Sequence, residues 1–125
     1  MTSDGVLFTG DALYVRELWA RHPLPYAIDP GLMRSSLRLI ESLDFDVLVP
    51  AHGTAPLSRA DAGGHMAHHL ARMDDVSEFL AELLVEPKTT EQAIAEVSRH
   101  VGLAESPAQY WLAVTTVKGY LSDLL

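Results

Sequence analysis

Two candidate metal ligands, Asp11 and His52, each come shortly after an apolar run of the sequence. The first run, Val6–Thr9, leads through Gly10 to Asp11, and the second, Asp46–Val49, leads through Pro-Ala to His52. Carboxylate oxygens and imidazole nitrogens are both ligands of zinc in proteins. If the fold brings these two side chains together, they can contribute to a metal site.

The elements around the two residues predict that they meet. Both apolar runs are rich in β-branched or aromatic residues and bounded by Gly or Pro, which predicts buried strands over residues 5–9 and 46–50. Between them, Met33, Leu37 and Ile40 recur at helical spacing. Strands joined by a crossover helix are parallel, so their C-terminal ends lie at the same edge of the sheet. Open α/β sheets bind their ligands at that edge.

The segments Gly5–Leu13 and Ser36–Gly53 resemble the second half of a metallo-β-lactamase-fold hydrolase, an α/β (αββα) sandwich. The resemblance rests on the Gly-Asp that follows the first strand and the Ala-His-Gly that follows the later one. In that family the Asp bridges two metal ions and the His completes the second site, which assigns these roles to Asp11 and His52. The resemblance implies zinc as cofactor and the attack of metal-activated water on an ester, thioester, lactam or phosphodiester.

The first-half signature of that family, His-x-His-x-Asp-His, does not occur in this sequence. A zinc site normally has three or four protein ligands, and the resemblance supplies two. We therefore expect residues 1–57 to be a partial metallo-β-lactamase-fold segment, from a truncated, split or degenerate protein. By itself the chain is expected to bind zinc weakly or not at all and to be inactive.

Residues 58–125 are expected to form a separate helical domain. Apolar residues at steps of three and four predict helices over His65–Leu84, from about Ile94 to Val101, and over Tyr110–Leu124. The order of these helices resembles the winged-helix-like domain attached to one branch of the hydrolase family, without its wing. Gly63-Gly64 argues against an earlier start of the first helix. Residues typical of helix N-termini are Ser58 with Asp61, Thr89 with Gln92, and Ser106-Pro107 with Gln109. Gly102 is typical of a helix C-terminus.

Two further groups of residues are candidates for a binding role. His65 and His69 are four residues apart on a predicted helix and could hold a metal weakly, although the pattern favours an exposed polar face. Trp19 and Tyr26 follow Asp11 in the loop where a substrate cleft would open. They would either line a pocket or cover the edge of the sheet.

Composition limits the other functions. The chain has 125 residues, no cysteine and a net charge of −8, so disulfides, thiolate metal sites and Cys nucleophiles are excluded. Residues 61–125 hold ten acidic and four basic side chains, which argues against nucleic-acid binding and against a winged-helix DNA binder. Neither a signal peptide nor a membrane span is evident, and a cytoplasmic protein is expected.

The alternative to a hydrolase portion is a non-catalytic helical interaction or dimerisation module that carries a vestigial half-site. Two parallel strands leave sheet edges and an apolar face to be covered. The expected partners are therefore a second copy of the chain or a complementary N-terminal half. A small-molecule substrate is expected if the site is complete, with no nucleic-acid or membrane partner.

Overall fold

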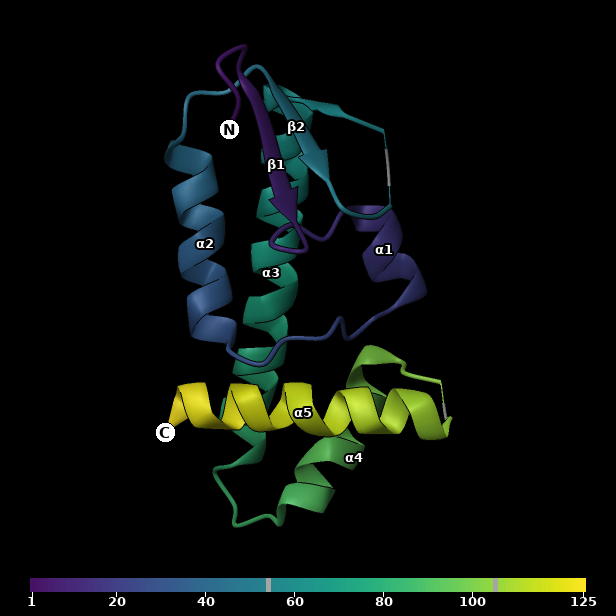
Figure 1. Ribbon diagram of the computed structural model, residues 1–125. Coiled ribbons are helices and arrows are strands. Elements are labelled where there is room, and N and C mark those ends of the chain that lie inside the picture. Colours follow the sequence, from purple (N-terminus) through teal and green to yellow (C-terminus); the bar gives the residue numbers. More distant parts are fainter. Residues whose placement is uncertain (54, 105) are drawn as a thin grey trace. The chain divides into compact units, whose positions relative to one another are not determined.

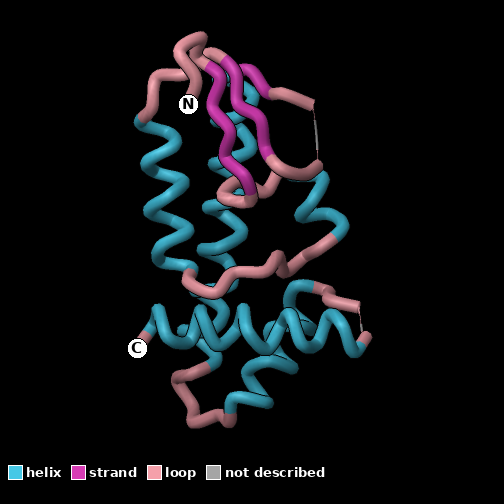
Figure 2. The backbone as a smooth tube through the Cα atoms, viewed as in Figure 1, coloured by secondary structure: helices cyan, strands magenta, loops and turns pink. Residues whose placement is uncertain are grey.

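A computed structural model describes residues 1–53, 55–104 and 106–125 (Figures 1 and 2). Helices and a small sheet make up an α+β fold, and the described helices include none long and apolar enough to cross a membrane. The elements are β1 (Val6–Gly10), α1 (Arg16–Arg21), α2 (Pro30–Ser42), β2 (Val47–Pro50), β3 (Leu57–Ser58), α3 (Arg59–Leu83), α4 (Thr90–Val101) and α5 (Pro107–Leu124).

The chain divides into two compact units, each built from two segments. The first consists of Met1–Arg21 and Leu32–Ala71, and the second of His22–Gly31 and Arg72–Leu125. Compactness by itself does not show that a unit folds alone. The two domains expected from the sequence, residues 1–57 and 58–125, therefore stay a prediction.

The parallel pairing of the first two strands confirms the predicted crossover. Strands β1 and β2 run in the same direction (Figure 1), with Leu7 opposite Leu48 and both side chains buried. Strand β3, only two residues long, pairs antiparallel with β2 and completes the sheet order β1-β2-β3. The sequence did not indicate β3, because two residues are too few to show an alternating pattern.

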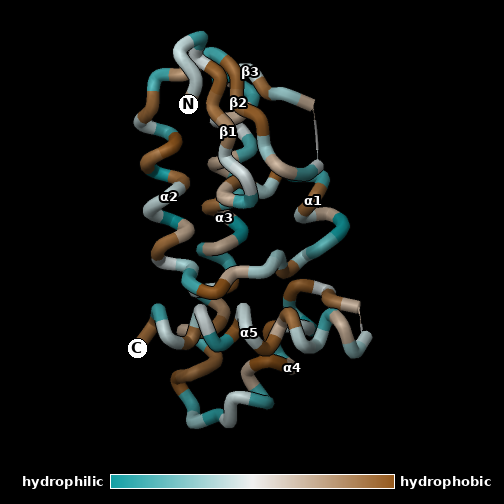
Figure 3. The backbone as a smooth tube through the Cα atoms, in the orientation of Figure 1, coloured by the Kyte–Doolittle hydropathy of each residue, from teal (hydrophilic) through white to brown (hydrophobic). Residues whose placement is uncertain are grey.

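Helix α2 is the crossover element and has the amphipathic character that its sequence predicts. Leu37 and Ile40 are buried, whereas Leu39 is exposed. Hydrophobic (brown) and hydrophilic (teal) residues follow one another along α2 in Figure 3. An apolar stripe of this kind holds a helix in place by the hydrophobic area that it removes from water.

Helix α3 begins at Arg59, earlier than the start predicted at His65. Gly63-Gly64 was expected to weaken any helix there, yet the helix runs through both glycines. The hydroxyl of Ser58 accepts a backbone N–H of the first turn, and Ala62 on that turn is fully buried. Capping and burial together outweigh the cost of about 1 kcal/mol for each helical glycine.

In the second unit, the predicted caps of the last two helices are confirmed. Thr89 and Gln92 form a reciprocal capping box at the start of α4, and Gly102 ends that helix with a left-handed φ of 74°. Ser106 caps α5, whose first residue is Pro107. Each cap satisfies backbone groups that a helix end leaves unpaired. The resemblance of this unit to a winged-helix domain stays a prediction.

Candidate metal centre

Asp11 and His52 meet beyond the C-terminal ends of the parallel strands. Asp11 follows the pair Gly10–Pro50 at the end of the β1–β2 ladder, and the N–H of Ala51 still donates to the carbonyl of Gly10 at 3.1 Å. The Nδ1 atom of His52 lies 2.8 Å from Oδ1 of Asp11. The side chains of Asp11 and His52 are 60% and 65% exposed, so this pair forms an accessible rim rather than a buried ion pair.

A glycine next to Asp11 and a glycine next to His52 allow the loops that carry these residues to approach one another. Gly10 has a φ of 57°, which turns the chain sharply before Asp11. Gly53 has a φ of 101°, and a β-carbon there would lie only 2.5 Å from Cγ2 of Val15. The loop after β2 therefore packs directly against the loop after β1, and a side chain at position 53 would separate them.

The hydrogen bond determines which nitrogen of His52 can bind a metal. An ionised carboxylate only accepts hydrogen bonds, so Nδ1 of His52 must carry the proton in its bond to Asp11. In the neutral ring this leaves a lone pair on Nε2, and Asp11 keeps a second carboxylate oxygen. These are suitable zinc donors, and a carboxylate that fixes the tautomer of a ligating imidazole is a common arrangement.

The pair supplies part of a zinc site. Among the described residues there is no group of three or more His, Cys, Asp or Glu side chains that could hold a metal ion. A working zinc centre normally has at least three protein ligands. The residues present thus fit two positions of such a centre, and the roles of Asp11 and His52 as ligands stay a prediction.

A cluster of aromatic rings lies next to the rim in the first unit. The ring centroid of His69 is 5.3 Å from that of Tyr14 and 5.3 Å from that of Trp19. Burial, and then the charge of the Asp11 carboxylate, raise the pKa of the Tyr14 hydroxyl above its usual range. Burial, and then the positive charges of His68 and Arg34, lower the pKa of His69 to about 4.

The pattern favoured exposure of both His65 and His69 on α3, but neither side chain is fully exposed. His69 is fully buried, and its Nδ1 accepts the backbone N–H of Tyr14 at 3.1 Å. His65 is half-buried, and its Nδ1 accepts the backbone N–H of Arg16 at 3.1 Å. Because both Nδ1 atoms already accept hydrogen bonds, a metal bound by this pair would have to use the Nε2 atoms. Their weak metal site stays a prediction.

The two aromatic residues predicted to line a substrate cleft differ in exposure. Trp19 is 6% exposed within the aromatic cluster, whereas Tyr26 is 42% exposed and belongs to the second unit. Neither placement tests a binding role, which stays a prediction for both. Tyr14 was not among the site residues predicted from the sequence, although its position three residues after the candidate ligand Asp11 was a signal that it lies near the site.

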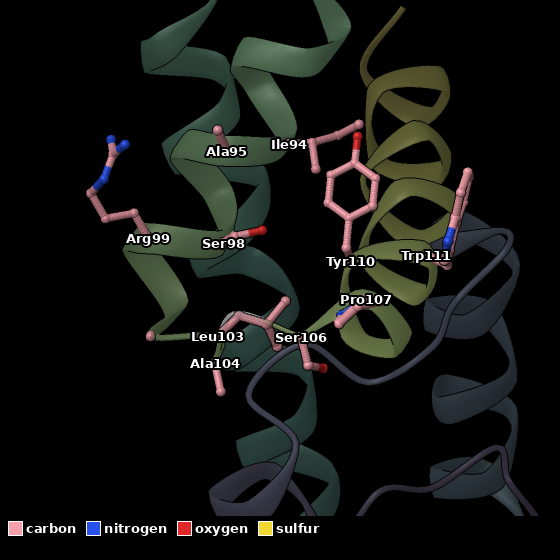
Figure 4. A pocket seen from close by; sticks show the side chains of 11 residues that line it. Ile94, Ala95, Ser98, Arg99, Leu103, Ala104, Ser106, Pro107, Tyr110 and Trp111 are labelled. Carbon is pink, nitrogen blue, oxygen red and sulfur yellow. The ribbon is translucent and has the colours of Figure 1, made fainter.

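The second unit has a pocket of about 820 Å³ between α4 and α5 (Figure 4). Beside it the first turns of α5 expose Tyr110, Trp111 and Leu112. Apolar exposure of this kind is compatible with an interface, but the structure does not show what covers it. The expected association with a second copy or a complementary half stays a prediction. The pocket is lined by Ile94, Ala95, Ser98, Arg99, Gly102, Leu103, Ala104, Ser106, Pro107, Tyr110 and Trp111.

Comparisons with known proteins concern the family and the fold. Residues 1–52 match the family described as the metallo-beta-lactamase superfamily. No curated protein is significantly similar to the chain. Among solved structures, a metallo-beta-lactamase family protein from Thermus thermophilus superposes with a TM-score of 0.56 and 29% sequence identity. The match covers 97% of this chain and 36% of the Thermus protein, so the chain spans about a third of the length of that relative.

Proposed function

The chain has the fold of the C-terminal portion of a metallo-β-lactamase-fold protein, and on that premise we propose that it supplies part of the zinc centre of a hydrolase. Asp11 and His52 are the proposed ligands. The observation that carries the proposal is their convergence, at 2.8 Å, beyond the C-terminal ends of two parallel strands. The remaining ligands would come from a His-x-His-x-Asp-His segment, which this sequence does not contain.

The chemistry of such a centre follows from its donor set. Asp11 and His52 would hold zinc together with the missing ligands, and the ion would there supply the activation of a water molecule near neutral pH. Asp11 holds the Nδ1 proton of His52 and keeps the Nε2 lone pair directed for coordination. The substrate would be an ester, thioester, lactam or phosphodiester, and the protein would act in the cytoplasm.

The assay for this function compares the chain alone with the chain preceded by a His-x-His-x-Asp-His half. The chain alone should show no zinc-dependent hydrolysis of a thioester or phosphodiester, because it has too few ligands. The joined protein should hydrolyse one of these substrate classes, and Asp11→Ala should reduce its kcat by at least about a hundredfold. Asp44→Asn is the matched control, since that carboxylate is fully exposed and pairs only with Arg59 in the ion pairs of the described structure.

Two results would contradict the proposal. The first is chelator-sensitive turnover by the chain alone that survives Asp11→Ala. The second is a joined protein that folds and binds zinc but whose activity is the same in the Asp11→Ala and Asp44→Asn variants. The second result would favour the alternative of a non-catalytic interaction module.

A further inference from the structure

The loop that follows Asp11 is held from one side by two histidines of helix α3. Tyr14 lies in this loop, and Arg16, two residues later, is the first residue of helix α1. Their backbone N–H groups donate to Nδ1 of His69 and Nδ1 of His65, each at 3.1 Å. The two histidines are four residues apart, one turn along the helix. The spacing of the acceptors on α3 therefore matches the spacing of the two donors.

We propose that His65 and His69 are positioning residues that clamp the backbone of residues 14–16 and thereby place the carboxylate of Asp11 against His52. The inference rests on the proposed function for its purpose, since Asp11 is the proposed ligand. Its structural content does not depend on a metal. Neither histidine binds zinc in this proposal.

The contacts on either side of Asp11 explain how the clamp reaches it. On the N-terminal side, the N–H of Ala12 donates to the carbonyl of Thr9 at 3.1 Å and closes the turn that contains Asp11. On the C-terminal side, the backbone from Tyr14 onward is fixed by the two imidazoles. With both ends held, few backbone conformations remain for Asp11, although its side chain is exposed.

The side-chain environment of His69 distinguishes a clamp from ordinary packing. This imidazole is fully buried between Tyr14 and Trp19, where a phenylalanine could fill similar space. A phenylalanine would, however, offer no acceptor to the N–H of Tyr14, and losing this part-buried hydrogen bond is costly. The nitrogen, and not only the ring, is therefore the feature that the loop requires.

The hydrogen bonds also dictate the tautomer of each ring. A neutral imidazole that accepts at Nδ1 carries its proton on Nε2, so His65 and His69 should both be Nε2–H tautomers. His52 donates from Nδ1 to Asp11 and should be the opposite tautomer. Because His52 depends on a correctly placed Asp11, its tautomer reports the position of that carboxylate without any metal.

The test uses paired variants of the metal-free chain at about pH 8, where imidazoles are neutral. His69→Phe and His65→Ala remove the acceptor, whereas His69→Asn and His65→Asn place a carbonyl oxygen at the δ position. His22→Ala is the control, because it removes an exposed imidazole from the second unit and leaves both clamping histidines in place. Amide hydrogen exchange and the ring-nitrogen NMR signals of His52 are measured in each variant, with circular dichroism to confirm the fold.

The expected result is a loss of amide protection of about tenfold or more at Tyr14 in His69→Phe and at Arg16 in His65→Ala. In both variants His52 should move from the Nδ1–H form towards a tautomer mixture, and the Asn variants should restore protection and tautomer. Unchanged exchange and an unchanged His52 tautomer in the folded His69→Phe and His65→Ala variants would overturn the proposal. So would loss of protection with His52 unaffected, because the clamp would then not reach Asp11.

A separate zinc titration of the unaltered chain shows whether a failed result concerns the clamp or the proposed zinc site. If the exchange and tautomer results are as expected and zinc shifts the signals of histidines other than His52, the clamp stands and the zinc proposal fails. If zinc binds there and its affinity is the same in His69→Phe as in His69→Asn, the clamp fails and the zinc proposal stands.

Discussion

Between about pH 6.5 and pH 4, His69 should lower the free energy of unfolding by about 3 kcal/mol. Its pKa is lowered from 6.5 to about 4 in the folded protein, chiefly by burial, so the unfolded chain binds a proton more readily in this range. The stabilisation is therefore fully present above pH 6.5 and is lost as the pH falls towards 4. A fully buried side chain experiences little solvent screening, which is why the effect is large.

Urea unfolding of the unaltered chain and of His69→Phe across this pH range measures the effect. Carboxylates titrate in both proteins, so the difference between the two curves isolates His69. Between pH 6.5 and pH 4 the free energy of unfolding of His69→Phe should fall by about 3 kcal/mol less than that of the unaltered chain. Parallel curves for the unaltered chain and His69→Phe would show that His69 is not neutral and buried.

The substitution Gly119→Ala in α5 should destabilise the protein by about 2 kcal/mol, although alanine is the better helix former. A β-carbon at this position would lie 2.5 Å from the carbonyl oxygen of Ile28 and 3.2 Å from that of Ala27. Both are backbone atoms of the same unit and cannot rotate away as a side chain would. The segment before α2 would have to move from the helix.

The matched control is Gly63→Ala in α3. A β-carbon there meets no atom within 4 Å, so alanine should stabilise the protein by about 0.5 to 1 kcal/mol through the smaller loss of backbone entropy. Thermal or urea unfolding of the two variants should give changes of opposite sign. Stabilisation by Gly119→Ala would show that Ile28 does not approach α5 this closely.

The sequence predicted those elements whose residues repeat in a clear pattern or carry a local signal. Strands β1 and β2, the crossover helix and the caps at Thr89 and Ser106 are of this kind. The early start of α3 was missed because Gly63-Gly64 lowers the local helix propensity, and burial of Ala62 reverses that preference only in the folded protein. Tertiary contacts of this kind leave no trace in a single sequence.

For the site, topology was enough to bring Asp11 and His52 to the same rim, because parallel strands must present their C-terminal ends at one edge. The contacts of His65 and His69 with the loop after Asp11 could not be predicted from the strand topology. Helical spacing shows that two histidines share a face, but whether that face meets solvent or a loop distant in the sequence depends on packing. The burial of His69 is therefore a result of the structure alone.

The most direct test of the zinc proposal is a zinc titration of the ¹⁵N-labelled chain followed at the histidine ring nitrogens. We expect Nε2 of His52 to shift first, with weaker binding than at a complete zinc site because only two ligands are present. Asp11→Asn should abolish the shift, whereas Asp44→Asn should not. A zinc-induced shift at His65, His69 or His22 with His52 unchanged would contradict the assignment of Asp11 and His52 as metal ligands.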